Sequence, residues 1–496
     1  MEKIVLVLDC GATNIRTIAV DAHGRILAVS SIPNNTQPDP YYPEYRIWDV
    51  KEIWKKFSQT TAAVLQKIQP NQIAAVTVTT FGVDGAPFTV RGEMLYPVIS
   101  WQCPRTTPVM ENIDKYIPLK ELYRISGLQP YNFNTITKLI WLKENRPEVV
   151  EKMDYFLFIS SIFLFYLTGV MTTDMTMAGT SMLTDLKNRR FSENILERIG
   201  FSSSLFPNLC EPGTVIGKTV KKASQSLGIP EGIPVVATGH DTQFAIYGSG
   251  AEEEVPVLSS GTWEILMVRS GNVNLDPELL RQGVTTEFDP IPGHYDIGVQ
   301  WIGSGALEWI KNMFYHAEVH DKHIYDLMIK EAEQVALGSK GIRLDTSFYP
   351  GSADAGTGMI TGLNMNSSRG EIYCAALESL ACRTRKSLGI LENAGNFTAQ
   401  QLLVVGGGAK NKLWNQLRSD IIGIPVRVVD QKETTVLGSA LFALAGTGLY
   451  GSPDEARQAV QYKTEDYVPA GNREKYESLY EEYVKFFESR KKTDTY

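Results

Sequence analysis

A pattern of apolar strand, small polar turn and apolar strand occurs twice in this chain. In the first copy, residues 3–20, an apolar run ends at Asp9 and turns through residues 10–13 before a second apolar run begins. In the second copy, residues 255–270, the turn is formed by the small residues 259–262. Both copies have the signature of a β-hairpin. The repetition predicts an α/β chain with a duplicated architecture, in which two hairpins hold one phosphate chain.

The first turn has the composition of a magnesium and phosphate site. A carboxylate such as Asp9 at the end of a buried strand can hold a hydrated Mg²⁺, and small turn residues let backbone N–H groups approach a polyphosphate. An ordinary hairpin with a glycine turn is the alternative. A third glycine-rich strand exit, residues 404–411, precedes a helical segment. Three such exits in one chain favour the phosphate interpretation.

The length and charge of the chain limit its organisation and its partners. With 496 residues the chain is too long for one compact core. A Gly-Ser-Gly triplet at 248–250, followed by three glutamates, marks a boundary, so we expect domains over 1–248 and 249–496. The net charge of −8 argues against a nucleic-acid surface. An anionic ligand must then be held locally, by helix N-termini, backbone N–H groups and a metal ion.

The sequence predicts a cytoplasmic protein without a membrane partner. The five cysteines are odd in number and lack zinc-site spacing, as expected for reduced thiols. The first apolar run is short and contains Asp9, unlike the core of a signal peptide. The most apolar stretch, 155–167, is too short for a bilayer span and is expected to be a buried helix. Assembly into a homo-oligomer is left open.

Residues 233–250 combine a strand exit with reactive side chains. A strand over 234–237 leads through a glycine to His240, Asp241 and Thr242, and a helix is expected from about Gln243. Asp241 or Thr242 could serve as the helix N-cap. Asp241 could instead point into a cleft and accept the proton of an attacking hydroxyl. Its position just before the expected domain boundary suits a cleft that closes on its ligands.

Two further segments have side chains that suit a sugar. Asp84 follows a strand over 75–79 and is either a turn former or a ligand for hydroxyl groups. Trp101 and Arg105 lie in a predicted loop over 100–106. A Trp face can pack on a sugar ring and Arg can donate to its hydroxyls, but a surface Trp covered by an Arg stem fits equally well.

Apolar residues at helical spacing predict most of the remaining elements. We expect a helix starting near Ser304, and helices over 48–69, 133–145, 375–391, 434–446 and 474–487. The segment GTVIGKT at 213–219 resembles a Walker-type phosphate loop. It is one residue too short between its glycines and no strand precedes it, so we reject it.

Taken together, these segments resemble the sugar kinases named for a Phe-Gly-Gly-Tyr signature, the FGGY family. Residues 133–145, FNTITKLIWLKEN, are similar to the family's first signature. The two hairpin turns, the GHDT segment and the VVGGGAKN segment also occur in the family's order. The resemblance covers nearly all of the chain. Within the family, TTFGVDG, SWQCPRT and GHDTQFA resemble the branch that phosphorylates L-fuculose. Cys103 departs from the wider family, where many members carry an Asp.

The resemblance implies two actin-like, ribonuclease-H-like ATPase domains around a central cleft for ATP and sugar, the first domain binding sugar and the second nucleotide. It implies that Asp9 acts on Mg²⁺ and that Asp241 is the catalytic base. The implied ATP contacts are Gly11, Ala12, Thr13, Asn14, Gly261, Thr262, Gly406, Gly407 and Asn411. The implied sugar contacts, besides Asp241, are Asp84, Arg105, His240, Thr242 and Gln300.

The implied reaction is transfer of the γ-phosphate of ATP to the 1-hydroxyl of L-fuculose. Such a transfer needs in-line placement of the hydroxyl and neutralisation of charge on the transferring group. L-rhamnulose or another small ketose is the alternative substrate. A non-catalytic sugar sensor and a polymerising actin-like ATPase are alternatives of another class. Loss of Asp9 or Asp241 would favour the sensor, and both residues are present.

Overall fold

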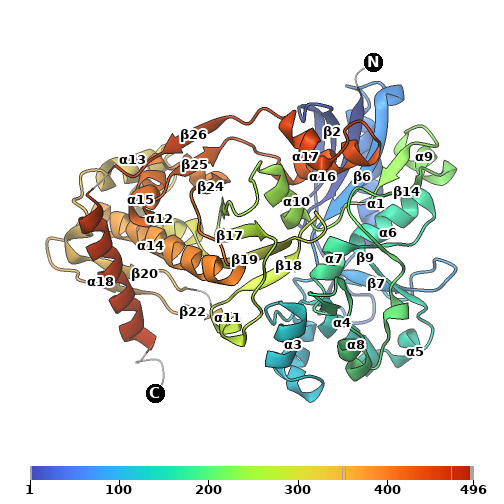
Figure 1. Ribbon diagram of the computed structural model, residues 1–496, viewed down its shortest axis with the longest axis horizontal. Coiled ribbons are helices and arrows are strands. Elements are labelled where there is room, and N and C mark those ends of the chain that lie inside the picture. Colours follow the sequence, from blue (N-terminus) through green and yellow to red (C-terminus); the bar gives the residue numbers. More distant parts are fainter. Residues whose placement is uncertain (1–2, 349, 352–353, 471, 492–496) are drawn as a thin grey trace. The chain divides into compact units, whose positions relative to one another are not determined.

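The computed structural model describes residues 3–348, 350–351, 354–470 and 472–491, and its contacts divide the chain into two compact units (Figure 1). The first unit consists of Met1–Gly250, Thr286–Asp296 and Glu433–Gln461. The second consists of Ala251–Thr285, Ile297–Lys432 and Tyr462–Tyr496. The chain thus leaves the first unit after Gly250, close to the expected boundary, but returns to it twice.

A six-stranded sheet forms the centre of the first unit. Its central strand, β1, is buried along its whole length, pairs antiparallel with β2, and pairs in parallel with β6 on its other side. Helices α1, α6 and α16 pack on the sheet, which explains why β1 reads as a continuous apolar run. The strands, in spatial order, are β14 Val215–Lys218, β15 Pro234–Val236, β6 Ile73–Thr80, β1 Ile4–Cys10, β2 Asn14–Asp21 and β3 Ile26–Pro33.

A seven-stranded sheet, most of whose strands belong to the second unit, repeats this arrangement around its own hairpin. Its strand β16 pairs antiparallel with β17 and in parallel with β24, as β1 does with β2 and β6. The duplicated architecture predicted from the two hairpins is therefore confirmed. The seven strands, in spatial order, are β18 Thr285–Phe288, β19 Tyr295–Ile302, β17 Trp263–Ser270, β16 Val257–Ser260, β24 Leu402–Val405, β25 Val426–Val429 and β26 Thr464–Tyr467.

Helices surround both sheets. Those of the first unit are α1 Val50–Val64, α2 Thr107–Glu111, α3 Leu119–Ser126, α4 Thr135–Asn145, α5 Pro147–Val150, α6 Ile159–Thr168, α7 Met175–Gly179, α8 Glu193–Ile199, α9 Lys221–Leu227, α10 Asp241–Gly248, α16 Thr434–Gly446 and α17 Pro453–Gln458. Those of the second unit are α11 Pro277–Arg281, α12 Ser304–Phe314, α13 Ile324–Ala332, α14 Arg369–Gly395, α15 Lys412–Ile422 and α18 Arg473–Lys491.

The return of α16 to the first unit follows from its composition. Residues 436–444 of this helix are all buried, because apolar and small side chains occupy every face. The helix packs against α10 (Figure 1). Added Cβ atoms on Gly248 and Gly438 would collide with the backbone of the opposing helix. Only glycine at these positions lets the two helices approach so closely.

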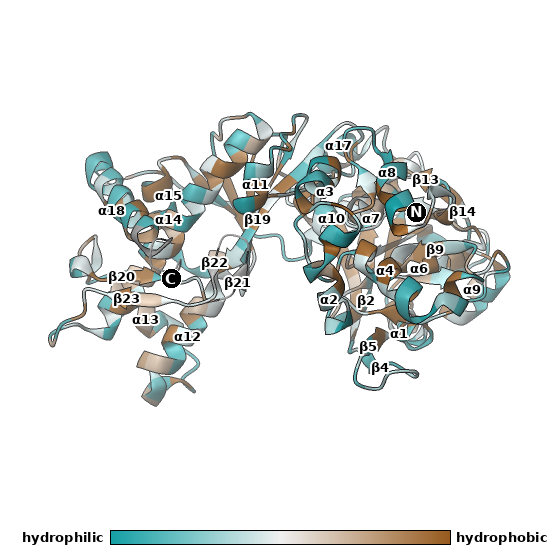
Figure 2. Cartoon of the chain, turned by 90° about the horizontal axis from the view of Figure 1, so that it is seen from below, coloured by the Kyte–Doolittle hydropathy of each residue, from teal (hydrophilic) through white to brown (hydrophobic). Residues whose placement is uncertain are grey.

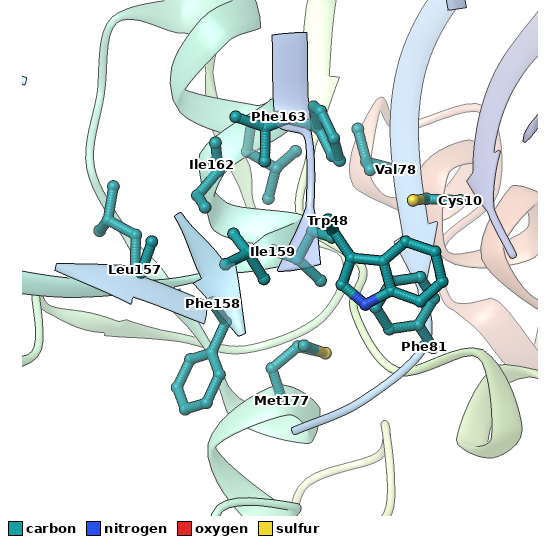
Figure 3. Packing of buried hydrophobic residues seen from close by; sticks show 14 of the residues in the cluster. Cys10, Trp48, Val78, Phe81, Leu157, Phe158, Ile159, Ile162, Phe163 and Met177 are labelled. Atoms are coloured by element: carbon teal, nitrogen blue, oxygen red, sulfur yellow. The ribbon is translucent and has the colours of Figure 1, made fainter. Parts of the chain in front are cut away.

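An aromatic and aliphatic core lies beside β6 (Figure 3). The Trp48 ring is fully buried, and its centroid lies 4.8 Å from that of Phe81. Ile159, Ile162 and Phe163 of α6 belong to the same core. Burial of these side chains fixes the end of β6, from which the residues of the candidate site extend.

Two predicted helices differ from the observed elements. The helix expected over 48–69 spans only Val50–Val64. It begins at Val50 because the Asp49 side chain accepts the N–H groups of Lys51 and Glu52 as an N-cap, and it ends at Val64 with Leu65 as the C-cap. The single helix expected over 155–167 was wrong for its first part. Residues Tyr155–Phe158 form strand β9, which pairs with β7 (Gly85–Phe88) before α6 starts. Aromatic residues favour a strand, and a short apolar run does not separate strand from helix.

The other predicted helices are confirmed in place and type. The expected helix over 375–391 is extended to Arg369 because Ser368 and Glu371 form a capping box. The rejected Walker-like segment, 213–219, contains β14 instead of a strand-to-helix turn. In the described part of the chain, no helix combines the length and apolarity that crossing a membrane requires. Figure 2 shows α18, for example, largely in hydrophilic colours.

Candidate active site

The β1–β2 turn presents the first set of predicted phosphate contacts. The Gly11 N–H donates to the Asn14 carbonyl at 2.9 Å and closes the turn. Asn34 supports it from outside, with its backbone N–H on the Thr13 carbonyl at 2.8 Å and its side-chain amide on the Gly11 carbonyl at 3.0 Å. Gly11 and Ala12 are half-buried, and Thr13 and Asn14 are exposed. The turn is thus firmly held and open to a ligand.

Asp9 lies at the end of β1 next to Arg16 on β2. Its side chain is 5% exposed, and Arg16 Nε donates to its Oδ2 at 2.7 Å. The same guanidinium donates through Nη1 to Glu433 Oε2 at 2.7 Å. Burial raises the pKa of Asp9 to about 6, against the opposing effect of Arg16 and with a contribution from the charges of Asp241 and Glu433. Asp9 and Asp241 are therefore close enough for their charges to interact.

Arg16 and Glu433 were not predicted from the sequence. Arg16 interrupts the apolar run of β2 directly opposite Asp9 in the hairpin register, and this was the available signal. Glu433 is 417 positions away from Arg16 and precedes α16, and no local pattern points to it. Of the three residues in this ion-pair network, only Asp9 was predicted from the sequence.

Asp241 is the first residue of α10, and its side chain is 32% exposed. The N-cap position belongs to His240, which makes no side-chain cap hydrogen bond. The N-cap interpretation of Asp241 and Thr242 was therefore wrong, because the extended backbone at His240 bridges to Thr80 and starts the helix two residues earlier than expected. Burial raises the pKa of Asp241, while the neighbouring His240 lowers it.

His240 lies between two carboxylates. Its Nε2 is 3.4 Å from Asp241 Oδ1 and its Nδ1 is 3.3 Å from Glu287 Oε2, on β18. Burial lowers the pKa of His240, but the interactions with Glu287 and Asp241 outweigh it, so the pKa lies above its ordinary value. Thr242 Oγ1 donates to Asp241 Oδ1 at 3.3 Å. Glu287 was missed because nothing in its strand sequence resembles a motif.

Asp84 is fully buried and its carboxylate is occupied by protein donors. Trp48 Nε1 donates to its Oδ2 at 2.7 Å and the Trp101 backbone N–H does so at 3.0 Å. Lys138 of α4, itself buried, forms an ion pair with Oδ1. The preceding residue, Val83, has a positive φ of 62°. In this structure none of the Asp84 side chain is exposed, and its carboxylate is fully paired within the protein.

Arg105 is also an interior residue and not a surface side chain covering Trp101. Its guanidinium is fully buried and donates to Asp39 Oδ2 at 2.8 Å and to the Tyr96 hydroxyl at 3.1 Å. Its Nε donates to Cys103 Sγ at 3.1 Å. The Cys103 thiol therefore lies against the buried guanidinium.

The β16–β17 turn carries the predicted contacts of the second unit. The Gly261 N–H donates to the Trp263 carbonyl at 3.0 Å. The carbonyls of Gly261 and Thr262 accept the N–H groups of Ser304 and Gly303, each at 2.9 Å. The turn is therefore tied to the first residues of α12, and Thr262 is exposed beside it. Gln300 lies on β19 with its side chain exposed.

The third glycine-rich segment packs against the base of the same turn. Gly406 has a φ of 94°, and a Cβ there would lie 2.6 Å from the Ser260 carbonyl oxygen. Gly407 is exposed with no atom near its Cβ position. Asn411 is the N-cap of α15, accepting from Trp414 N at 3.1 Å and donating to the Tyr373 hydroxyl at 3.2 Å. The structure thus brings the predicted contacts of the second unit close to one another.

A buried ion pair lies beneath these loops. Arg418 of α15 and Glu264 of β17 are both fully buried and form a salt bridge. Ser260 joins them, donating to Glu264 Oε1 at 2.9 Å and accepting from Arg418 Nη2 at 3.0 Å. The Arg418 guanidinium also lies 3.6 Å from the centroid of the Trp414 ring. This ion pair therefore links β17, which follows the β16–β17 turn, to α15, which follows the glycine-rich segment.

Comparison with known proteins identifies the class. Residues 4–248 match the N-terminal domain of the FGGY family of carbohydrate kinases, and residues 257–447 match its C-terminal domain. The chain belongs to this family. It is therefore an ATP:sugar phosphotransferase with the actin-like ATPase fold.

Individual relatives show which members of the family this chain is similar to. The chain is 44% identical to the L-fuculokinase of Escherichia coli (strain K12) over 470 residues, which cover 94% of this chain and 98% of that protein. It is 44% identical to the L-fuculokinase of Haemophilus influenzae over 464 residues, covering 92% and 98%. The crystal structure of a xylulose kinase from Rhodospirillum rubrum matches with a TM-score of 0.87 at 21% identity, covering 98% and 99% of the two chains. This last likeness supports the fold alone.

Proposed function

We propose that this enzyme phosphorylates L-fuculose, transferring the γ-phosphate of ATP to the 1-hydroxyl and yielding L-fuculose 1-phosphate in fucose breakdown. The observation that carries the proposal is the 44% identity to an L-fuculokinase over 94% of the chain. We place the reaction in the cytoplasm, where the free cysteines of the chain remain reduced.

Asp241 acts in this proposal on the attacking hydroxyl. Its partial exposure at the start of α10 leaves the carboxylate free to accept a hydrogen bond from a sugar. Phosphoryl transfer asks little covalent chemistry of the protein, so the main task of Asp241 is to orient the hydroxyl and to take its proton as the new bond forms. Its raised pKa makes it a better base than an ordinary exposed Asp.

The phosphates of ATP are held in this proposal by the two hairpin turns, through Gly11, Ala12, Thr13, Asn14, Gly261 and Thr262. The adenosine lies along Gly406, Gly407 and Asn411. Glycine at Gly407 leaves open space next to the backbone, which suits close approach of a ligand. Arg16 supplies positive charge next to the first turn.

For the sugar we propose contacts from His240, Thr242 and Gln300, which are all at least partly exposed. Asp84 and Arg105 support the sugar site in this proposal without contacting the sugar, since both side chains are fully buried. Asp84 does so by fixing the backbone N–H of Trp101. Arg105 does so by holding the loop that contains Cys103.

Asp9 fits a magnesium ion that is bound chiefly through its nucleotide. Both contacts from Arg16 go to Oδ2 of Asp9, and the other oxygen is the one suited to a hydrated cation. The described residues contain no cluster of three His, Cys, Asp or Glu side chains that could form a closed metal cage. Mg²⁺ is commonly bound by one or two carboxylates together with water and substrate phosphates, where it neutralises charge on the phosphates.

Asp9→Asn is expected to raise the Mg²⁺ concentration for half-maximal activity by about 10- to 100-fold, the range for weakened metal binding. The measurement is a Mg²⁺ titration of ADP release at saturating ATP. Glu433→Gln is the control, because it removes the other carboxylate paired with Arg16. An equal shift in both variants would mean that the Arg16 network, and not a metal contact, is responsible.

A panel of ketoses tests the proposed substrate. With Mg²⁺ and ATP, L-fuculose is expected to give a kcat/KM at least about tenfold above that of L-rhamnulose, D-ribulose or D-xylulose, a difference of about 1.4 kcal/mol in transition-state stabilisation. The measurement is ADP release for each sugar and for a control without sugar. A different preferred ketose would overturn the substrate assignment.

The sugar-free control addresses the other classes of function. ADP release that ignores sugar would indicate an actin-like ATPase, and sedimentation on adding ATP would indicate polymerisation. No release with any sugar would indicate a non-catalytic sensor. A homo-oligomer is compatible with every outcome, and the elution volume of the active enzyme measures it.

A further inference from the structure

Glu287 is a carboxylate beside the catalytic segment that the reaction described above does not use. It lies on β18, its side chain is 15% exposed, and its Oε2 is 3.3 Å from His240 Nδ1. The side-chain amide of Gln243, on the first turn of α10, donates to the same oxygen. Residue Thr286 next to it donates its N–H to the Gly127 carbonyl at 2.9 Å, which fixes the strand. Glu287 is thus held in place against the imidazole.

The His240 ring is fixed from the other sides as well. The His240 backbone N–H donates to Thr176 Oγ1 at 2.9 Å. A Cβ on Gly82 would lie 2.8 Å from Nε2, so only a glycine at this position leaves room for the ring. With Nδ1 facing Glu287, the Nε2 edge faces Asp241 Oδ1 at 3.4 Å. The result is a line of carboxylate, imidazole and carboxylate that ends at the proposed base.

We propose that Glu287 is a positioning residue of the kinase reaction, which acts through His240 to fix the orientation and the charge of the imidazole that faces Asp241. This inference rests on the proposed function of Asp241.

The chemistry follows from where the protons lie. A carboxylate next to Nδ1 stabilises the doubly protonated ring, whose Nε2–H then points to Asp241. A positive charge next to Asp241 favours the ionised carboxylate, which is the form that accepts the hydroxyl proton. Asp241 passes that proton to water after the product leaves, and His240 keeps both of its own. Glu287 therefore acts on the base without touching the sugar.

Other charged groups also lie near His240 and Asp241. Asp174 lies behind it, because a Cβ on Gly239 would collide with its carboxylate and because Asp174 accepts from the Thr176 hydroxyl. His240 and Asp241 act on each other, Glu287 acts on both, and the charges of Arg16, Asp241 and Glu433 act on the adjoining Asp9. Among them, Glu287 is the one at ion-pair distance from His240 Nδ1.

Glu287→Gln is the first test, because it keeps the shape of the side chain and removes its charge. We expect the alkaline limb of the kcat/KM profile, where His240 loses its proton, to move to lower pH by about one unit, the size of a lost opposite charge. The KM for ATP is expected to stay the same. His240→Gln should abolish the alkaline limb. Glu287→Asp keeps the carboxylate and should therefore move the limb less than Glu287→Gln does. The control is Asp454→Asn, which removes a carboxylate that accepts from the Tyr247 hydroxyl and should leave the limb in place.

A second readout does not depend on activity. His240 is one of six histidines, and His240→Gln identifies its resonance in an NMR titration of the imidazole protons. Glu287→Gln is expected to lower the measured pKa of His240 by the same one unit or so. A folded variant with an unshifted His240 pKa would overturn the inference, even if the enzyme phosphorylates L-fuculose. Absence of ketose-dependent ADP release in the unmodified enzyme, with the pKa shift present, would instead overturn the proposed function.

Discussion

Asp241→Asn is expected to lower kcat by about 10²–10⁴, the range for the loss of an acid–base group, while the variant still binds sugar. The amide has the shape of the carboxylate and preserves the start of α10. It cannot take up the hydroxyl proton, and it lacks the charge that orients the hydroxyl. Because Asp241 is a third exposed and does not cap the helix, we expect the loss to fall on turnover and to spare the fold.

The measurement combines kcat from ADP release with sugar binding measured by calorimetry. Asp454→Asn is the matched control, since Asp454 is a partly exposed carboxylate of the same unit that accepts from the Tyr247 hydroxyl. It should change kcat by less than about twofold, as an ordinary surface substitution does. Unchanged turnover in Asp241→Asn would remove Asp241 from the mechanism.

The pH profile gives a further check on Asp241. Burial raises its pKa above the ordinary value for Asp, so the unmodified enzyme should lose kcat/KM as the pH falls through this raised pKa. Activity falls toward low pH because only the ionised Asp241 carboxylate accepts the hydroxyl proton. The acidic limb should be absent from the residual activity of Asp241→Asn.

Local patterns were sufficient to predict several parts of the site. The two hairpin turns, the strand exit at His240 and the helix over 434–446 all lie where the sequence placed them, because strand exits, glycine turns and helical periodicity are local signals. The duplicated architecture could be predicted for the same reason, since each half carries its own hairpin.

The partners of the site residues could not be predicted in this way. Glu287 reaches His240, and Glu433 reaches Arg16, across long separations in sequence that only the folded chain closes. Burial also changed the interpretation of Asp84 and Arg105. Their neighbours in sequence suggested exposed loops, whereas the folded chain surrounds both with aromatic rings and countercharges.

Arg418→Met is expected to destabilise the protein by about 3–5 kcal/mol, the usual effect of removing one partner of a buried ion pair. The substitution keeps an apolar stem next to Trp414 but leaves the fully buried Glu264 without its countercharge. The measurement is the urea concentration at the unfolding midpoint. The double variant Glu264→Leu with Arg418→Met should recover most of the loss, because a packed apolar pair avoids the desolvation of two charges.

The pH dependence of the stability lost in Arg418→Met distinguishes the contribution of the Arg418–Glu264 ion pair from that of packing against Trp414. Burial raises the pKa of Glu264 and Arg418 lowers it, so removal of Arg418 raises the folded-state pKa further above the unfolded value. A raised folded pKa makes the protein less stable as the pH increases, because the folded state then holds a proton that the unfolded state has released. The destabilisation by Arg418→Met should therefore be larger near about pH 8 than near about pH 5. An equal loss at both pH values would mean that the contact between Arg418 and the Trp414 ring, and not the ion pair, stabilises the base of the β16–β17 turn.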